Sequence, residues 1–418
     1  MEKLSANFNT CRGTAVRLPS LRIMLYKDGI LAALSDVTRK AYQACTVTLH
    51  DTHGVHILPA HFKGRGYGSW RADPPKRNYR IKFIKKLQLF DMPASRHFCL
   101  IAGVWNNKDG SMLKSDSAFS LARAVLTNME YSVRTRPVEV YVNNGYHGVF
   151  TLSEKVRPEK HKINISCKTG DIDTGYLLNY VWFEHTERAP PESRFQAEGL
   201  KKSPRGIKGN EENAEYFIIK SPSARGADPT EYAALVQCIK GQTQKLADAL
   251  IALDYEAFSR LADVPSFVDN LILQELYKNT DYGAGGCYLY KKRGGGKLYA
   301  GPPWDFDWAV NGGCEGFYTI NGTTQNPSPF ITYLYAMPKF KELVICRWQK
   351  TADKIKTFLI DFFNGYINEP SYKHLFGKNF ALWDAKCPHA AASDWKKDAE
   401  CLRDWLFNRA DWLSGQWC

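Results

Sequence analysis

The chain contains the stretch Gly301-Pro302-Pro303-Trp304-Asp305-Phe306-Asp307-Trp308, in which two acids alternate with large aromatic residues. In an extended segment, residues i and i+2 point to the same side, so Asp305 and Asp307 are expected to present two carboxylates to one point. Mg²⁺ in proteins is usually held by one or two carboxylates together with substrate phosphates. The stretch therefore predicts a divalent-metal site, although an isolated Asp-x-Asp is also typical of a solvated turn between buried tryptophans.

Another acid precedes this stretch and follows a predicted helix. Apolar residues at helical spacing predict a helix over residues 266–276, which places Asp281 in the loop directly after it. The runs 287–292 and 297–300 are predicted as the two strands of a hairpin that leads to Asp305. A loop acid, a hairpin and a second acid form the order in which protein kinases carry their catalytic base and their metal-binding aspartate.

Several separate motifs in this order resemble the CotH kinase family, a group of atypical kinases named for a spore-coat protein. The matching stretches are Lys63–Trp70 with its Gly-Arg-Gly and Ser-Trp, Pro75–Phe83, Val138–Lys155, the pair Asn279 and Asp281, and Trp304–Trp308. The resemblance extends from about Leu18 to the C-terminus. It implies phosphoryl transfer from ATP with Mg²⁺ or Mn²⁺, with serine or threonine of a protein as acceptor.

The order of the predicted elements indicates an α+β protein with an atypical two-lobed, kinase-like fold. Residues 1–156 form a β-rich first lobe with one helix, and residues 157–228 hold further strands and a charged surface insertion. Residues 229–418 form a helical second lobe that carries the acids. The elements predicted within this order include a helix over about 111–129, a hairpin over 138–152, strands over 175–180 and 217–220, and a long surface loop over 184–214.

Positive charge is concentrated in one part of the chain. The formal net charge is +13, and residues 63–86 hold nine lysines and arginines against a single acid, Asp73. Such a patch attracts a nucleoside triphosphate, an acidic protein or a nucleic acid, and it is also typical of a solvated basic face. No helix-turn-helix, zinc-finger or RNA-binding signature is visible, so nucleic acid ranks below nucleotide as a partner.

Four residues are predicted to bind the nucleotide. The alternation in Tyr79–Phe83 predicts a strand that presents Arg80 and Lys82 on one face. By the parallel with kinases, Lys82 contacts the phosphates with Arg80 in support, and the glycine-rich loop around Arg65 lets backbone N–H groups approach phosphate. Glu154 begins the segment whose backbone meets adenine; alternatively, its carboxylate pairs with Lys82.

The resemblance also implies the roles of the acids. Asp281 accepts the proton of the acceptor hydroxyl or aligns it, Asp305 binds the metal, and Asp307 assists or orients. Two departures from the family pattern matter. Gly286 stands where relatives tend to have Asn or Ser, which puts a second metal site in doubt, and Lys114 stands where relatives tend to have Arg, which replaces a planar fork by a point charge.

Composition limits the remaining possibilities. A hydrophobic content of 44% and an aromatic content of 13% favour a folded globular protein. No stretch approaches the roughly 20 apolar residues that span a bilayer, and no secretory signal is visible, so membrane insertion is not expected and both a cytoplasmic and a spore- or surface-associated location stay open. The eleven cysteines contain no Cys-x-x-Cys pair, which disfavours a zinc site; most are expected to be reduced core residues.

Two other functions fit the same residues. Clustered acids beside cations also serve metal-dependent phosphoesterases and nucleases, which release free phosphate or cut nucleic acid. A nucleotide-binding pseudokinase that acts as a coat or assembly protein is the other alternative, and Gly286 is the feature that favours it. For a kinase, the basic surface suits an acidic protein substrate.

Overall fold

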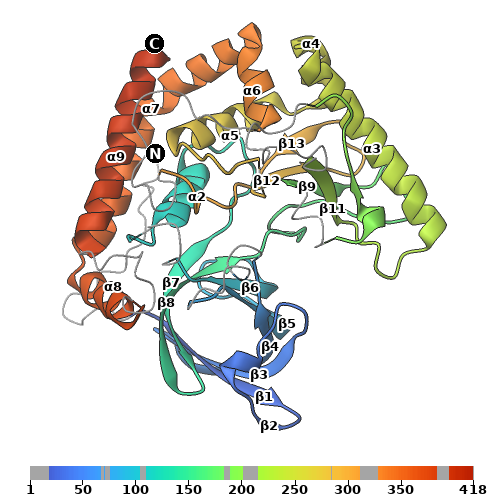
Figure 1. The fold of residues 1–418 in the computed structure, drawn as a ribbon. Helices are drawn as coiled ribbons and strands as arrows, with labels where there is room; N and C mark the ends of the chain where they lie inside the picture. The colour runs from blue at the N-terminus through green and yellow to red at the C-terminus, as the bar shows by residue number, and fades with distance from the viewer. Residues whose placement is uncertain are drawn as a thin grey trace, which may run out of the picture.

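The structure is a computed structural model, which describes residues 18–66, 70, 76–103, 110–182, 189–200, 215–283, 285–310, 328–383 and 395–417. Strands of the N-terminal part gather at one end of the molecule, and helices of the C-terminal half at the other (Figure 1). The predicted α+β class with a β-rich first half is confirmed, whereas the correspondence to the two lobes of a kinase stays a prediction. No helix in these ranges is both long enough and apolar enough to cross a bilayer.

Most N-terminal strands form a closed barrel. The first sheet has the order β2-β1-β3-β4-β5-β6-β8-β7, and β1 also pairs with β7 in parallel, so the sheet closes on itself with β2 outside the ring. The strands are β1 Ser20–Lys27, β2 Ile30–Leu31, β3 Gln43–Asp51, β4 Gly54–Gly64, β5 Tyr79–Leu87, β6 Ser95–Ile101, β7 Thr135–Val142 and β8 Gly145–Glu154.

Alternating side chains explain this barrel. On β5, Ile81 and Phe83 are buried in the barrel core, whereas Arg80 and Lys82 point outward, as the sequence predicts. The predicted hairpin is also confirmed, because β7 and β8 are joined through Asn143 and Asn144, both with positive φ. Two successive positive φ angles define the turn whose twist matches the flanking strands.

The second sheet connects the barrel to the helical part. Its order is β10-β11-β9-β12-β13, with β9 Tyr176–Trp182, β10 Arg194–Phe195, β11 Glu215–Ser221, β12 Cys287–Lys291 and β13 Leu298–Ala300. The expectation of a loop throughout 184–214 is wrong at β10, where Phe195 packs into the core and pairs with Phe217. The rest of that predicted loop lies largely outside the described residues.

Helices make up most of the C-terminal half. They are α2 Lys114–Ala124, α3 Pro229–Ile251, α4 Tyr255–Leu261, α5 Val264–Leu276, α6 Pro329–Ala336, α7 Pro338–Ile367, α8 Pro370–Trp383 and α9 Trp395–Gln416, with short 3₁₀ turns at Leu34–Asp36 and Pro191–Ser193. The prediction of a helix over 111–129 is wrong at both ends. Met112 has a φ of 57°, which no right-handed helix accommodates, and the helix ends at Ala124 although Leu126 and Met129 remain in the core.

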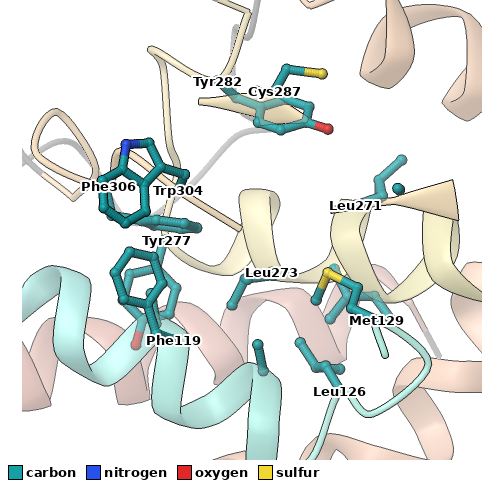
Figure 2. Close-up of a cluster of buried hydrophobic side chains, with 14 of the residues drawn as sticks. Phe119, Leu126, Met129, Leu271, Leu273, Tyr277, Tyr282, Cys287, Trp304 and Phe306 are labelled. Atoms are coloured by element: carbon teal, nitrogen blue, oxygen red, sulfur yellow. The ribbon is translucent and has the colours of Figure 1, made fainter. Parts of the chain in front are cut away.

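Helix α5 is the centre of the helical part. Asp263 caps it by accepting a hydrogen bond from the Ser266 N–H at 3.0 Å. All its residues from Ser266 to Leu276 are buried, because the helix contacts α7, α9 and β13. Leu271 and Leu273 of α5 meet Leu126 and Met129 in the cluster drawn in Figure 2. The acid-bearing loop therefore starts from a rigid, fully packed element.

A buried lysine ties the barrel to helix α8. Lys76 is inaccessible to solvent, and its Nζ donates to the carbonyl oxygens of Ala102 and Val149 and, at 3.0 Å, to Asn379 Oδ1 of α8. Asn379 Oδ1 also accepts from the Val149 N–H at 2.9 Å. The barrel and the C-terminal half thus share a buried polar contact.

None of the seven cysteines in the described ranges forms a disulfide. Cys45, Cys99 and Cys287 are buried, but the other four are partly or fully exposed. The expectation that most cysteines are core residues is therefore wrong for this part of the chain.

Candidate active site

Asp281 lies in the predicted loop after α5. The helix ends at Leu276, and a φ of 44° at Lys278 turns the chain away from the helix axis. The Asp281 N–H donates to Asn279 Oδ1 at 3.2 Å, which holds the loop in a tight turn. Asp281 is half-buried, so part of this residue remains accessible to solvent.

Asn279 joins the two acidic segments. Its side chain is inaccessible to solvent, and Nδ2 donates to Gln274 Oε1 at 2.9 Å and to the carbonyl oxygen of Asp305 at 3.3 Å. The same amide accepts from the Asp281 N–H, so one side chain positions the backbone of both acids. The sequence placed Asn279 in a family motif, but no spacing rule predicts that it bridges residues 281 and 305.

The aromatic residues around Asp305 anchor its segment in the core. Trp304 stacks on Phe119 with ring centroids 5.8 Å apart, and Phe306 lies edge-on to Tyr277 at 5.4 Å (Figure 2). Asp305 itself is half-buried. The tryptophan and phenylalanine therefore fix the segment from the inside, while the acid between them stays on the accessible side.

Asp305 and Asp307 are not related by a strand pleat. Asp305 has a φ of 65° and residues 307 and 308 form a turn, so the expectation of an extended segment is wrong here. Burial nevertheless alternates, because Trp304 and Phe306 are buried while both acids are half-exposed. A hydrogen-bonded carbonyl and packed aromatic rings, rather than strand geometry, hold this segment.

The space beside Gly286 is too small for a side chain. A Cβ there would lie 2.4 Å from the carbonyl oxygen of Trp304 and 3.1 Å from Asp305 Cβ. The neighbouring residues are held by Asn179, whose Nδ2 donates to the carbonyl oxygens of Gly285 and Cys287 at 2.9 and 3.1 Å. A metal-ligating amide at residue 286 is thus sterically excluded, and the doubt about a second metal site gains a physical cause.

Lys114 supports the same segment from helix α2. Its buried Nζ donates to the carbonyl oxygens of Asp307 and Ala309 at 2.8 and 3.1 Å. A compact ammonium suits two carbonyl acceptors, whereas a guanidinium would present a planar fork. Lys114 therefore positions the backbone that follows Asp305, a role that the sequence did not predict.

The acids suit a metal that also binds a ligand. Across the described part of the chain, no three His, Cys, Asp or Glu side chains come close enough to hold a metal by themselves. Mg²⁺ commonly takes only one or two protein carboxylates and completes its shell with phosphate oxygens and water. The half-exposed Asp305 and Asp307 fit that kind of binding better than a dedicated protein cage.

Arg65 connects the glycine-rich loop to the acidic segment. Its guanidinium carbon lies 5.4 Å from the ring centre of Trp304, directly before Asp305. Arg65 follows the last residue of β4, and its N–H donates to the carbonyl oxygen of Asn78 just before β5. The structure thus places one predicted nucleotide-binding residue beside the predicted metal-binding segment.

The outer face of the barrel carries what we call the basic cluster: Lys63, Arg80, Lys82, His97, Lys155 and Arg157. Strand register brings its first members together, because Arg80 lies opposite Lys63 and Lys82 lies opposite His97. Two of the three cations predicted from the sequence to bind the nucleotide, Arg80 and Lys82, belong to it. Lys155, Arg157 and His97 were missed because they come from other strands and loops.

The cations of this cluster destabilise one another. Burial, followed by the charges of Arg157, Lys155, Arg80 and Lys82, lowers the pKa of His97 to about 3. Burial and then Arg80 hold the pKa of Lys155 well below its usual range, and the same two causes lower that of Lys63. Arg80 Nε is buried without a hydrogen-bond partner in the described residues. A bound anion would offset the repulsion among these cations.

Glu154 does not pair with Lys82. Its buried carboxylate accepts from the Arg134 N–H at 2.8 Å, and its Oε1 lies 3.2 Å from the Nζ of the equally buried Lys162. Glu154 ends β8 opposite Phe98 of β6, so its backbone still borders the basic cluster. A backbone contact to the nucleotide therefore stays a prediction, while the alternative of a Glu154–Lys82 ion pair is wrong.

Fold and site together define a mixed α+β protein in which loop carboxylates and a cluster of cations are connected through Arg65. The family model described as CotH kinase protein matches residues 61–413, and the chain belongs to the CotH kinase family. The matched residues include every predicted site residue and the barrel strands β5 to β8. A search of curated proteins finds no match to this chain.

Proposed function

We propose that this protein transfers the γ-phosphoryl group of ATP to a hydroxyl group of a protein. The observation that carries the proposal is the bridge by Asn279, which holds the Asp281 and Asp305 segments together in the order expected of a kinase. The neighbouring basic cluster supports it, because Lys63, Arg80 and Lys82 form no ion pair within the described residues and are available to bind phosphate. Membership of the CotH kinase family agrees with this activity.

Each residue then has a defined task. The hydroxyl oxygen of the acceptor forms the new bond to the γ-phosphorus, and Asp281 accepts the proton of that hydroxyl. The bond between the γ-phosphorus and the oxygen that leaves with ADP breaks. Arg80 and Lys82 bind the phosphates and offset their charge, with Arg65 beside the acidic segment. The backbone around Glu154 borders the adenine ring of ATP.

Asp305 would hold the metal, with Asp307 in support. A bound Mg²⁺ or Mn²⁺ supplies charge compensation for the phosphate oxygens and fixes their orientation. The contribution of the chain is to fix the acid: Asn279 binds the Asp305 carbonyl oxygen, and Lys114 binds the backbone that follows.

The test is transfer of labelled γ-phosphate from ATP, with Mg²⁺ or Mn²⁺, to the protein itself and to added proteins. The wild type is compared with Asp281→Ala and Asp305→Asn, and Asp353→Asn on the exposed face of α7 serves as the matched control. We expect label on protein for the wild type and the control, and loss of at least about 1,000-fold in both site variants.

Other outcomes separate the alternatives. ATP binding by calorimetry without transfer to any acceptor would favour the pseudokinase. Release of free phosphate or cleavage of nucleic acid, lost in both site variants, would favour the phosphoesterase or nuclease. Transfer that survives in Asp281→Ala and Asp305→Asn would remove these two acids from the proposal.

A further inference from the structure

The outward face of strand β4 forms a continuous surface that we call the β4 strip: Val55, Ile57, Pro59, His61 and Lys63. The intervening residues Ala60 and Phe62 are buried in the barrel core, so strand alternation turns the strip away from it. Its far end is apolar and open to solvent, because Val55 is 60% exposed and Ile57 is 71% exposed. Ile84 of the neighbouring strand β5 is also exposed.

The near end of the strip meets the candidate active site. Lys63 is two residues before Arg65, whose guanidinium lies 5.4 Å from the ring centre of Trp304. At about 3.3 Å per residue, Ile57 lies roughly 26 Å from Arg65 along the strand. The strip therefore leads from the predicted point of phosphoryl transfer to an exposed apolar end.

Charge at the near end favours an anionic occupant. Lys63 lies opposite Arg80, and His61 lies opposite Lys82. Within the described residues, no carboxylate forms an ion pair with Lys63, Arg80 or Lys82. A MgATP complex carries about two net negative charges, so cations of the basic cluster remain uncompensated after it binds. A second anionic group can therefore bind beside the nucleotide.

We propose that the β4 strip docks the acceptor protein as an extended segment. Acidic residues next to the acceptor hydroxyl contact Lys63 and its neighbours, and apolar residues further along the segment cover Ile57 and Val55. This proposal deepens the proposed kinase function and rests on it for the position of the acceptor hydroxyl.

The cationic end and the apolar end of the β4 strip together favour a polypeptide over a nucleic acid. The phosphate backbone of a nucleic acid would use the cations but gains nothing from exposed isoleucine and valine. A polypeptide can satisfy both, because an extended chain has the same rise per residue as β4. Acids are then expected about two to four positions from the acceptor serine, and apolar residues about eight to ten positions away.

The first experiment measures binding without nucleotide. Fluorescent peptides carry one serine, three glutamates at the near positions and leucines at the far positions, in both chain directions. Matched peptides replace the glutamates by lysine or the leucines by serine. Binding is followed by anisotropy for the wild type, Ile57→Glu, Lys63→Glu and the control Ile172→Glu, whose side chain is 66% exposed outside the strip.

We expect the acidic, leucine-bearing peptide to bind at least about tenfold more tightly than either matched peptide. Ile57→Glu and Lys63→Glu should each weaken it about tenfold, and Ile172→Glu should not. Equal binding of all peptides, or no effect of the two strip variants, overturns the docking proposal. So does competition in which saturating MgATP displaces the peptide fully, because the cluster then holds the nucleotide alone.

A second measurement, transfer of labelled phosphate, distinguishes failure of the docking proposal from failure of the proposed kinase function. If labelled phosphate is transferred to acidic and lysine-bearing peptides with equal kcat/KM, the docking proposal fails while the kinase stands. If the acidic peptide binds and Ile57→Glu weakens it, but no peptide is ever labelled, the strip is a docking surface and the kinase function fails. Binding of anionic vesicles or duplex DNA that is lost in Ile57→Glu, without peptide binding, assigns the strip to another partner and overturns the proposal.

Discussion

The acidic loops and the basic cluster are held in opposite ways. Around the acids, Asn279 and Lys114 donate hydrogen bonds to backbone carbonyl oxygens, and Gln274 accepts a hydrogen bond that orients Asn279. In the basic cluster, Arg80 and Lys82 form no ion pair within the described residues, and neighbouring cations repel one another. The comparison indicates that hydrogen bonds within the chain fix the geometry of the acidic loops, whereas Arg80 and Lys82 receive no counter-charge from the described residues.

The substitution with the largest expected effect on the acidic loops is Asn279→Ala. It removes the hydrogen bonds that the Asn279 side chain gives to the buried Gln274 Oε1 and to the Asp305 carbonyl oxygen, so the free energy of unfolding should fall by about 2–4 kcal/mol. Phosphoryl transfer should fall about 100-fold, because Asp305, the residue that we propose to bind the metal, loses its support. Chemical denaturation and labelled transfer measure both, with exposed Asn368→Ala as control. Unchanged transfer in a folded Asn279→Ala protein would contradict the bridging role.

The next test adds a single methyl group beside Asp305. Gly286→Ala places a Cβ 2.4 Å from the Trp304 carbonyl oxygen, so the backbone must shift. We expect a loss of about 1–3 kcal/mol in stability together with weaker Mn²⁺ binding, measured by calorimetry with ATP. The matched control is Gly377→Ala in α8, where a Cβ meets nothing within 4 Å. This substitution should be neutral or stabilising, since alanine is the better helix former. Equal behaviour of the two variants would refute the close approach at position 286.

Removing a positive charge from the basic cluster should raise the stability of the protein, whereas the two substitutions above should lower it. Arg80→Met relieves repulsion with Lys63 and Lys155, so we expect the free energy of unfolding to rise by about 1 kcal/mol while ATP affinity falls about tenfold. Lys85→Met, an exposed lysine of the same strand, is the control and should change neither quantity much. Destabilisation by Arg80→Met would show that this arginine has a structural role instead.

The smallest expected effect concerns His97. Its pKa of about 3 lies below the ordinary 6.5, so between these values the unfolded chain binds a proton that the folded chain excludes. His97 therefore lowers stability as the pH falls from about 6.5 toward 3. A bound triphosphate should raise the pKa of His97, because it adds negative charge among the surrounding cations. NMR titration of the imidazole with and without triphosphate checks both statements; a pKa near 6.5 in the free protein contradicts the first.

Local patterns predicted much of this molecule, and contacts distant in sequence account for the rest. Alternation along Tyr79–Phe83 correctly placed Arg80 and Lys82 outside the barrel, and Asn144 correctly marked a hairpin turn. The loop position of Asp281 followed from the helix before it. In each of these cases, neighbouring residues alone determine the outcome.

The failures share a different cause. The role of Asn279 depends on residue 305, and the partner of Glu154 is Lys162 rather than Lys82. His97 joins the basic cluster only because β6 pairs with β5. The helix predicted from residue 111 begins later because Met112 takes a positive φ in a buried turn, which no hydrophobic periodicity reveals. Each depends on tertiary pairing that one sequence does not encode locally.

The buried Lys76 has a consequence for how this protein can be divided. Its ammonium group needs Asn379 from α8 as well as two carbonyl groups near the barrel. A fragment that stops after β8 would lack Asn379 and the rest of α8, so the Lys76 ammonium group would lose one of its acceptors and the helix that packs against this side of the barrel. We therefore expect the barrel expressed alone to be insoluble or unfolded, and expect gene fusions and exchanges between relatives to keep residues 76 and 379 together. The strand-rich and helix-rich ends of the molecule in Figure 1 are therefore expected to fold as one unit.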